Sequence, residues 1–128
     1  KTMKIYGVGT DIVSVDRIKK SIKNKNFLER LFSKEETSKC SKLNNSNNCY
    51  AKRFAAKEAF SKALGTGISN GINFNEIIVM NEKNGKPFIK LSGKTLKIIK
   101  KKFKKKPSIS LSLSDEKKYA VAFVTISL

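Results

Sequence analysis

The alternation of apolar and polar side chains predicts strands near both ends of the chain. Residues 3–13 (MKIYGVGTDIV) are predicted to form one strand, with two glycines and Asp11 on the same face. Glycine is unusual inside a strand, and here it suggests that a neighbouring backbone approaches closely. Residues 108–114 (SISLSLS) alternate strictly, and YAVAFVTI at 119–126 is predicted to return as an antiparallel strand.

Helical spacing follows the first strand. Ser14 can cap a helix in which Val15, Ile18 and Ile22 share one face, which leaves the basic residues between them open to solvent. A second short helix is predicted at 27–32.

The longest predicted helix lies in the middle of the chain. Ser33 and Glu36 match a capping box for a short helix, after which the Asn-rich segment 44–48 is predicted to be a loop. The long helix then runs from about 50 to 64, and Gly65 ends it.

The remaining segments complete the fold class. Residues 72–93 are predicted to form a β-hairpin that turns at Asn84-Gly85, and residues 94–106 a basic amphipathic helix closed by Pro107. Helices gather in the first half and strands in the second, without βαβ alternation or repeats. We therefore expect one domain, 1–128, with an α+β fold in which an antiparallel sheet packs against the long central helix.

Charge adds a constraint on the partner. The 128 residues include 28 Lys+Arg against 10 Asp+Glu, a formal net charge of +18. This favours an acidic partner, which could be nucleic acid, an anionic membrane, a phosphorylated small molecule or an acidic protein. Nucleotide-composition drift accounts equally well for part of the lysine excess. No apolar run approaches the ~20 residues that a membrane span requires.

The residue types exclude several chemistries. The chain has no His, so imidazole catalysis and imidazole metal ligation are absent. Cys40 and Cys49 cannot form a four-ligand zinc site by themselves, and we expect them to be reduced thiols, with a disulfide as the alternative. The remaining candidate ligands are carboxylates, which suit hard ions such as Mg²⁺.

The long helix carries the main candidate chemistry. One half of it collects polar residues and the other half is rich in alanine; the polar residues are Arg53, Lys57, Glu58, Ser61 and Lys62. Glu58 and Lys62 have the i, i+4 spacing of a solvated surface pair. The alternative is a carboxylate that binds a metal beside cations that bind phosphate.

Asp11 is the second candidate acid. It stands near the end of the glycine-bearing strand, where a turn or cap would explain it equally well. If Asp11 and Glu58 converge, two carboxylates from distant segments would make a Mg²⁺ site that keeps positions open for phosphate and water.

Four stretches of the sequence resemble one family. YGVGTDIVSVDRI, RFAAKEAFSKALGTGI, NGKPF and SLSLSDEKKYAVAFV are similar, in this order, to signature segments of the holo-acyl-carrier-protein synthases, the small bacterial-type 4′-phosphopantetheinyl transferases. The resemblance implies transfer of the phosphopantetheine arm of coenzyme A to a serine of acyl carrier protein, with release of adenosine 3′,5′-bisphosphate. It also implies Mg²⁺ dependence, a role in fatty acid biosynthesis and a homotrimer with each CoA site at a subunit interface.

The resemblance also assigns residues. Asp11 and Glu58 match the metal ligands, Glu58 and Lys62 the catalytic positions, and Arg17 and Lys20 the surface that receives the carrier protein. The positions that match contacts to CoA lie on the long helix, the hairpin turn and the next strand: Arg53, Lys62, Gly65, Gly85, Lys86, Pro87 and Ser110. Ser110 stands where many members have a His beside the adenine and 3′-phosphate.

Other functions fit the pattern less well. A nucleic-acid-binding module is compatible with the charge, but most aromatic residues are Phe at core spacing and no known binding motif occurs. A membrane-surface role for 94–106 is weaker, because its apolar stripe is narrow. We expect the KKKFKKK run to be a solvated helix face, and the protein to be cytoplasmic, or in a plastid-like organelle if a targeting segment has been removed.

Overall fold

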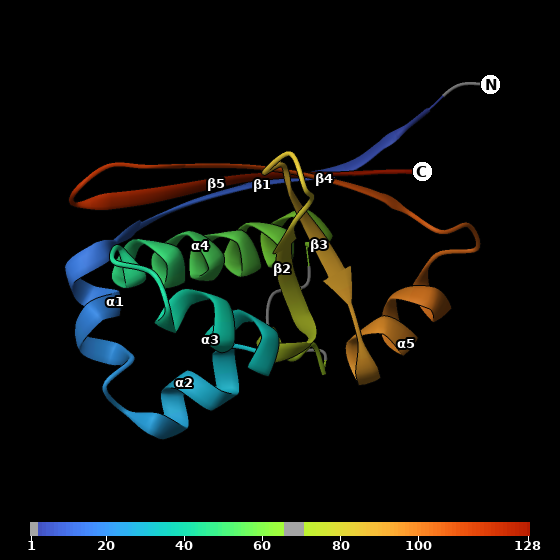
Figure 1. Ribbon diagram of the computed structural model, residues 1–128. Coiled ribbons are helices and arrows are strands. Elements are labelled where there is room, and N and C mark those ends of the chain that lie inside the picture. The colour runs from blue at the N-terminus through green and yellow to red at the C-terminus, as the bar shows by residue number, and fades with distance from the viewer. Residues whose placement is uncertain (1–2, 66–70) are drawn as a thin grey trace.

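The computed structural model describes residues 3–65 and 71–128. In chain order its elements are β1 (Ile5–Ser14), α1 (Val15–Ser21), α2 (Lys25–Leu31), α3 (Lys34–Ser41), α4 (Ser46–Leu64), the 3₁₀ turn η2 (Phe74–Glu76), β2 (Ile77–Asn81), β3 (Pro87–Leu91), α5 (Gly93–Lys102), β4 (Ser108–Asp115) and β5 (Tyr119–Ser127) (Figure 1).

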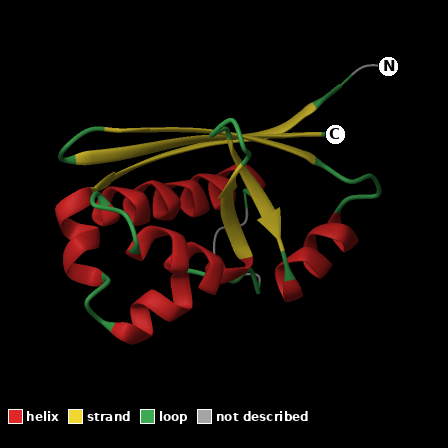
Figure 2. Ribbon diagram, viewed as in Figure 1, coloured by secondary structure: helices red, strands yellow, loops and turns green. Residues whose placement is uncertain are grey.

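An antiparallel sheet covers one side of α4. Its strand order is β1-β5-β4, so β1 and β4 are the two edges. The other helices and the separate β2–β3 hairpin lie on the same side of this sheet as α4 (Figure 2). The expected α+β architecture, with an antiparallel sheet against a long central helix, is confirmed.

The glycines of β1 allow the sheet to lie directly on α4. A Cβ added to Gly9 would collide with the carbonyl oxygen of Ala59, and one added to Gly7 with that of Ala63. The predicted close backbone approach is therefore confirmed, and it seats Asp11, two residues after Gly9, beside the middle of α4.

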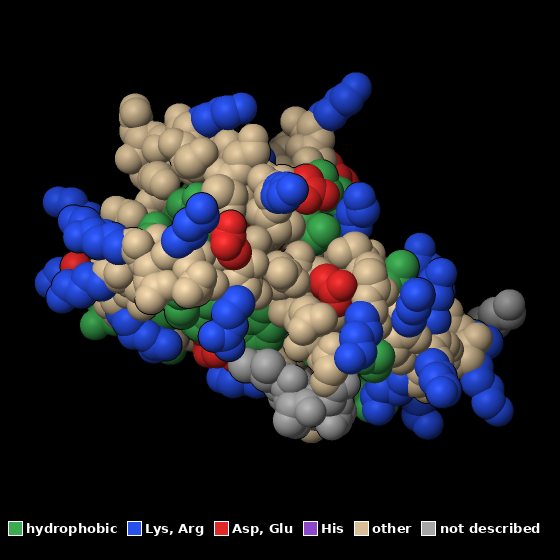
Figure 3. Space-filling model, turned by 90° about the horizontal axis from the view of Figure 1, so that it is seen from below, with side chains coloured by type: hydrophobic (Ala, Val, Ile, Leu, Met, Phe, Trp, Pro, Cys, Tyr) green, Lys and Arg blue, Asp and Glu red, His purple; other side chains and the backbone are tan. Residues whose placement is uncertain are grey.

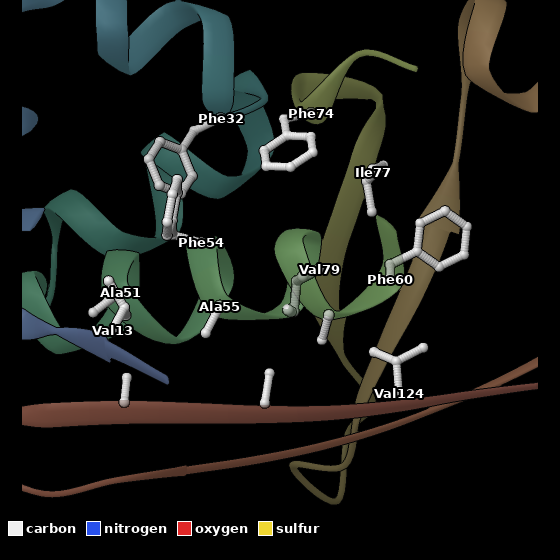
Figure 4. Close-up of a cluster of buried hydrophobic side chains, with 14 of the residues drawn as sticks. Val13, Phe32, Ala51, Phe54, Ala55, Phe60, Phe74, Ile77, Val79 and Val124 are labelled. Atoms are coloured by element: carbon white, nitrogen blue, oxygen red, sulfur yellow. The ribbon is translucent and has the colours of Figure 1, made fainter. Parts of the chain in front are cut away.

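Opposite faces of α4 bury side chains of different size. Ala55 points toward the strands, whereas Phe54 points the other way, toward Phe32 (Figure 4). The Phe54 ring also lies 6.4 Å from that of Phe74 and 6.5 Å from that of Phe27. The small residues bring the sheet close to α4, and the aromatic residues fill the wider layer between α4, the short helices and η2.

The ends of two helices differ from the prediction. α4 begins at Ser46, inside the segment that was predicted to be a loop. The cause is a contact distant in sequence: the Asn48 side chain donates to Asp115 Oδ2 (2.8 Å) and to the carbonyl oxygen of Glu116 (2.9 Å), which fixes the start of α4 at the β4–β5 turn. α5 ends earlier than predicted, with Phe103 as its buried C-cap.

The two cysteines form a disulfide, so the expectation of reduced thiols was wrong. The short connection between α3 and α4 places the Cα atoms of Cys40 and Cys49 5.4 Å apart. Both side chains are buried, at 0% and 3% exposure, although the Asn-rich sequence beside them indicated a surface loop. The bond ties the last turn of α3 to the first turn of α4.

Candidate active site

Asp11 on β1 meets α4 at one edge of the sheet. Lys62 Nζ donates to the carbonyl oxygen of Thr10 (2.9 Å) and to Asp11 Oδ1 (3.3 Å). The Asp11 side chain is 17% exposed and that of Lys62 57% exposed, so the pair lies at the surface with its acid turned inward. The sequence predicted that these residues converge, but it paired Lys62 with Glu58; the structure pairs Lys62 with Asp11.

Glu58 completes this group. Partial burial raises the pKa of the Glu58 carboxyl, and the negative charge of Asp11 raises it further, whereas Lys62 and Arg17 act in the opposite direction. The contribution of Asp11 to this shift indicates that the two carboxylates lie near each other. A divalent cation between them would relieve this repulsion.

The donor set suits a hard ion. Within residues 3–65 and 71–128, no cluster of three or more His, Cys, Asp or Glu could hold a metal. Two carboxylates are nevertheless the number that Mg²⁺ commonly takes from protein, because water and substrate phosphate fill its other positions. Asp11 and Glu58 therefore fit Mg²⁺ better than an ion that needs a closed protein site.

The polar half of α4 is not one surface. Lys57 is fully buried and donates to Glu36 Oε1 (2.8 Å), to the carbonyl oxygen of Phe74 (2.8 Å) and to that of Ile77. Burial lowers the pKa of the Lys57 ammonium to about 8, and Glu36 partly opposes this shift. Ser61 is buried as well, and with Arg53 three of the five residues that the helical pattern placed together belong to the interior.

Arg53 also lies in the interior, at 4% exposure. Its Nη2 donates to Asn81 Oδ1 (3.0 Å) and its Nη1 to Cys49 Sγ (3.3 Å). Asn81 in turn donates through Nδ2 to the carbonyl oxygen of Gly85 (3.0 Å), so Arg53 is linked to the β2–β3 turn. The structure thus links Arg53 to the turn at Gly85 through Asn81, a residue that the sequence did not single out.

The residues expected at CoA do not gather in one place. Arg53 and Glu58 project from α4 about 140° apart. Asp11 lies on β1, one edge of the sheet, and Ser110 on β4, the opposite edge, with its side chain exposed. Gly65 ends α4 with a φ of 80°, as predicted for its C-cap, whereas Thr66 and Gly67 of the same motif fall outside the described residues. The residues expected at CoA therefore lie in separate places on the chain, with Asp11 at the β1 edge of the sheet and Ser110 at the β4 edge.

The surface expected to receive a carrier lies on α1. Arg17 and Lys20 are exposed, and Lys20 pairs with Asp16 at 3.1 Å. The Arg17 guanidinium also lies 5.9 Å from the centre of the Phe54 ring. Its charge acts on the Glu58 carboxyl, so it lies near Asp11 and Glu58. Lys and Arg side chains are spread over the face that the helices form, with few acids among them (Figure 3).

A cavity of about 890 Å³ lies elsewhere, between β3, α5 and β4. Ile109, in its wall, pairs with Ile126, whereas Asp11 pairs with Ala122 four residues along β5. Four strand residues span about 13 Å, so this cavity is separate from the site formed by Asp11, Glu58 and Lys62.

Three residues with clear roles escaped the sequence analysis. Glu36 was recognised only as a capping residue, and Lys39 and Asn81 were not recognised at all. A capping signal reports local geometry, whereas the contacts of Glu36 with Lys57 and of Lys39 with Asn81 join residues 21 and 42 positions apart. No spacing rule finds such partners.

Comparison with known proteins places nearly the whole chain in one family. The family model described as the 4′-phosphopantetheinyl transferase superfamily matches residues 7–124. A holo-[acyl-carrier-protein] synthase of Pelagibacter ubique is 52% identical over 97% of this chain and 98% of its own length.

Solved structures agree. The holo-[acyl-carrier-protein] synthase of Neisseria meningitidis superposes with a TM-score of 0.84 at 40% identity, covering 95% of this chain and 98% of that one. The enzyme of Bacillus anthracis in complex with CoA (3′,5′-ADP) superposes with a TM-score of 0.80 at 35% identity over 98% of both chains. This chain therefore belongs to the holo-[acyl-carrier-protein] synthases of the 4′-phosphopantetheinyl transferase superfamily.

Proposed function

We propose that this chain transfers the 4′-phosphopantetheine group of coenzyme A to a serine of apo-acyl carrier protein, releasing adenosine 3′,5′-bisphosphate. The observation that carries the proposal is the meeting of Asp11, Glu58 and Lys62 at the β1 edge of the sheet. Several relatives carry the name of this activity, and those from Bacillus anthracis and Helicobacter pylori have CoA in their crystals.

In this proposal Asp11 and Glu58 hold Mg²⁺. The bound ion would supply positive charge that neutralises the pyrophosphate oxygens of CoA. Lys62, fixed on Thr10 and Asp11, turns its ammonium toward the same space and stabilises negative charge on the phosphoryl oxygens.

Glu58 is the proposed proton acceptor. Its carboxylate lies near Asp11 and Lys62, where the transfer is proposed to occur, so it is placed to accept the proton of the serine hydroxyl. The serine hydroxyl of the carrier gives its proton to Glu58, and its oxygen forms a bond to the β-phosphorus of CoA. The bond between that phosphorus and the bridging oxygen breaks, and the electron pair leaves with adenosine 3′,5′-bisphosphate.

We further propose that two copies of the chain build each site, in a homotrimer. Arg53, Gly85, Lys86, Pro87 and Ser110 lie away from the β1 edge and could serve the nucleotide of a CoA held by a neighbouring copy. Supporting this, the outer face of β1 and β5 exposes large apolar side chains: Val8 at 54%, Ile12 at 65%, Tyr119 at 47% and Phe123 at 46%. Apolar surface of this kind marks a protein interface.

The partner in this proposal is an acidic carrier that docks on Arg17 and Lys20 of α1. The net charge of +18 would speed the encounter and make it sensitive to salt. We propose that the reaction serves fatty acid biosynthesis in a bacterial cytoplasm. We also propose that residues 1–128 form one domain. In the described part of the chain, no helix is long and apolar enough to cross a membrane.

Mass spectrometry tests this function directly. Purified protein is incubated with CoA, Mg²⁺ and an apo-acyl carrier protein, and the carrier mass is expected to rise by one phosphopantetheine group. A carrier whose acceptor serine is replaced by alanine is the control, and EDTA is expected to stop the reaction until Mg²⁺ is restored. A folded protein that leaves several apo-carriers unmodified would contradict the proposal.

A further inference from the structure

Two cations meet on a neutral amide at the edge of the β2–β3 hairpin. Lys39 Nζ, from α3, donates to Asn81 Oδ1 at 2.7 Å, and Arg53 Nη2, from α4, donates to the same oxygen at 3.0 Å. A carboxylate at this position would neutralise one of the two charges. The amide oxygen fixes both side chains but leaves their charges available.

The surrounding groups do not cancel this charge. Glu36, the acid that acts on Arg53, is already engaged by Lys57 Nζ and by the backbone N–H groups of Ser33 and Val79. Lys52 adds a third cation, which Asp115 accompanies at 3.5 Å. Loss of solvation, followed by repulsion from Arg53 and Lys52, lowers the pKa of Lys39, as expected for a site with unneutralised positive charge.

The two cations differ in access. Arg53 is 4% exposed, and its Nε is buried without a hydrogen-bond partner within the described structure. Lys39 is exposed at the end of α3. An anion from solvent therefore contacts the exposed Lys39 ammonium first, while the buried Arg53 holds Asn81 in place through its hydrogen bond to Oδ1.

Asn81 also holds the turn that the proposed function assigns to the nucleotide. Its Nδ2 donates to the carbonyl oxygen of Gly85 at 3.0 Å, and Gly85 has a φ of 92°, which only glycine adopts readily. A single side chain thus fixes the position of the turn relative to Lys39 and Arg53.

We propose that Lys39 is a further CoA-binding residue and that Asn81 is a positioning residue for it and for the Gly85–Pro87 turn. This inference rests on the proposed function. The diphosphate of CoA belongs with Asp11, Glu58 and Lys62, where the phosphorus–oxygen bond breaks. The remaining anion of the molecule is the ribose 3′-phosphate, and Lys39 binds it.

Steady-state kinetics with two donors tests the role of Lys39. For Lys39→Gln we expect KM for CoA to rise about tenfold, since an ion-assisted contact is lost, with kcat and KM for the carrier unchanged. With 3′-dephospho-CoA, which lacks the phosphate in question, the variant and the wild type should have equal KM. Lys42→Gln, an exposed lysine three residues further along, is the matched control and should behave as wild type.

Unchanged KM for CoA in Lys39→Gln, while the wild type transfers normally, overturns the assignment and leaves the proposed function intact. An equal rise for both donors would place Lys39 at another part of CoA and equally overturns it. If the wild type modifies no carrier, the proposed function itself fails, so the two failures are distinguishable.

Asn81→Asp separates ligand binding from structure. The new carboxylate would pair with Lys39 and Arg53 but cannot donate to the carbonyl oxygen of Gly85. The ion pairs offset the lost turn contact, so the melting temperature is expected to stay near that of the wild type while KM for CoA increases. If Asn81 had only a structural role, KM for CoA would rise only when the melting temperature of the variant falls. An Asn81→Asp variant that binds CoA as wild type contradicts the positioning role.

Discussion

Two ion pairs on α4 differ in almost every physical respect. Lys57 and Glu36 are 2.8 Å apart and both side chains are 0% exposed, whereas Lys62 and Asp11 are 3.3 Å apart and 57% and 17% exposed. Both lysines belong to the same short motif, RFAAKEAFSKALGTG. The difference shows how one motif can carry both a structural element and the proposed catalytic one.

The two sites differ mainly in how many hydrogen-bond and ion-pair partners the acidic side chain has. Glu36 accepts from Lys57, from Ser33 N–H and from Val79 N–H, which ties α4, α3 and β2 together and leaves little room for a ligand. Asp11 and Glu58 repel each other and face Lys62 at the surface. The closed pair holds the fold, and the open group keeps oxygen atoms available for a cation and substrate.

The largest predicted effect is on the open group. Glu58→Gln removes both the proposed base and one metal ligand, so the transfer rate should fall by at least about 100-fold. Because Glu58 is partly exposed and the negative charge of Asp11 repels its carboxylate, the melting temperature should not fall. The measurement is initial transfer rate together with thermal unfolding, and wild-type turnover in this variant would remove Glu58 from the mechanism.

The closed pair predicts the reverse pattern. Lys57→Met leaves the buried Glu36 carboxylate without its ammonium partner and should cost about 3–5 kcal/mol of unfolding free energy. Adding Glu36→Gln should restore part of this loss, because both charges are then gone while the amide oxygen can still accept from a backbone N–H group of Ser33 or Val79. Urea unfolding of the two variants is the test, and a Lys57→Met protein as stable as wild type would show that the pair does not hold the fold.

The disulfide beside Arg53 should contribute less. Opening the Cys40–Cys49 bond releases a short loop, so the unfolding free energy should fall by about 2–3 kcal/mol. Unfolding with and without a reductant measures this, and the double variant Cys40→Ser, Cys49→Ser serves as a control that no reductant should affect. Equal stability of the oxidised and reduced proteins would argue against the bond as a tie between α3 and α4.

The smallest effects are two opposite slopes of stability with pH. The folded state raises the pKa of Glu58, so it binds a proton more tightly than the unfolded chain; stability should fall as pH rises through and above 4.5. The folded state lowers the pKa of Lys57 to about 8 from 10.5, so the unfolded chain holds more protons and stability should rise between these values.

Unfolding free energy measured across both pH ranges should show these slopes, with Glu58→Gln removing the first and Lys57→Met the second. If the pH dependence of the unfolding free energy persists after the assigned residue is replaced, a different titrating group causes it.

Local signals in the sequence predicted local structure well. The capping box of Ser33 and Glu36, the αL end of α4 at Gly65 and the turn at Asn84-Gly85 depend on neighbours within four residues, and all three are confirmed. The sequence left both acids open to an ordinary surface role, and it was the family resemblance that assigned Asp11 and Glu58 to one metal site.

The rest depends on contacts that no local pattern records. A helical wheel places Lys57 beside Glu58, but the protein buries Lys57 because Glu36 lies across from it. The early start of α4 and the disulfide likewise follow from where distant segments pack, through Asn48 on the β4–β5 turn and Cys40 against Cys49.

The most direct test of the account is whether Asp11 and Glu58 together hold a divalent ion. Electron paramagnetic resonance of Mn²⁺, used in place of Mg²⁺, can measure this in the presence of CoA. We predict tight binding to the wild type and to Asp115→Asn, a surface acid outside the site, and loss of binding in both Asp11→Asn and Glu58→Gln. Folded Asp11→Asn protein that binds Mn²⁺ as tightly as wild type would contradict the central claim.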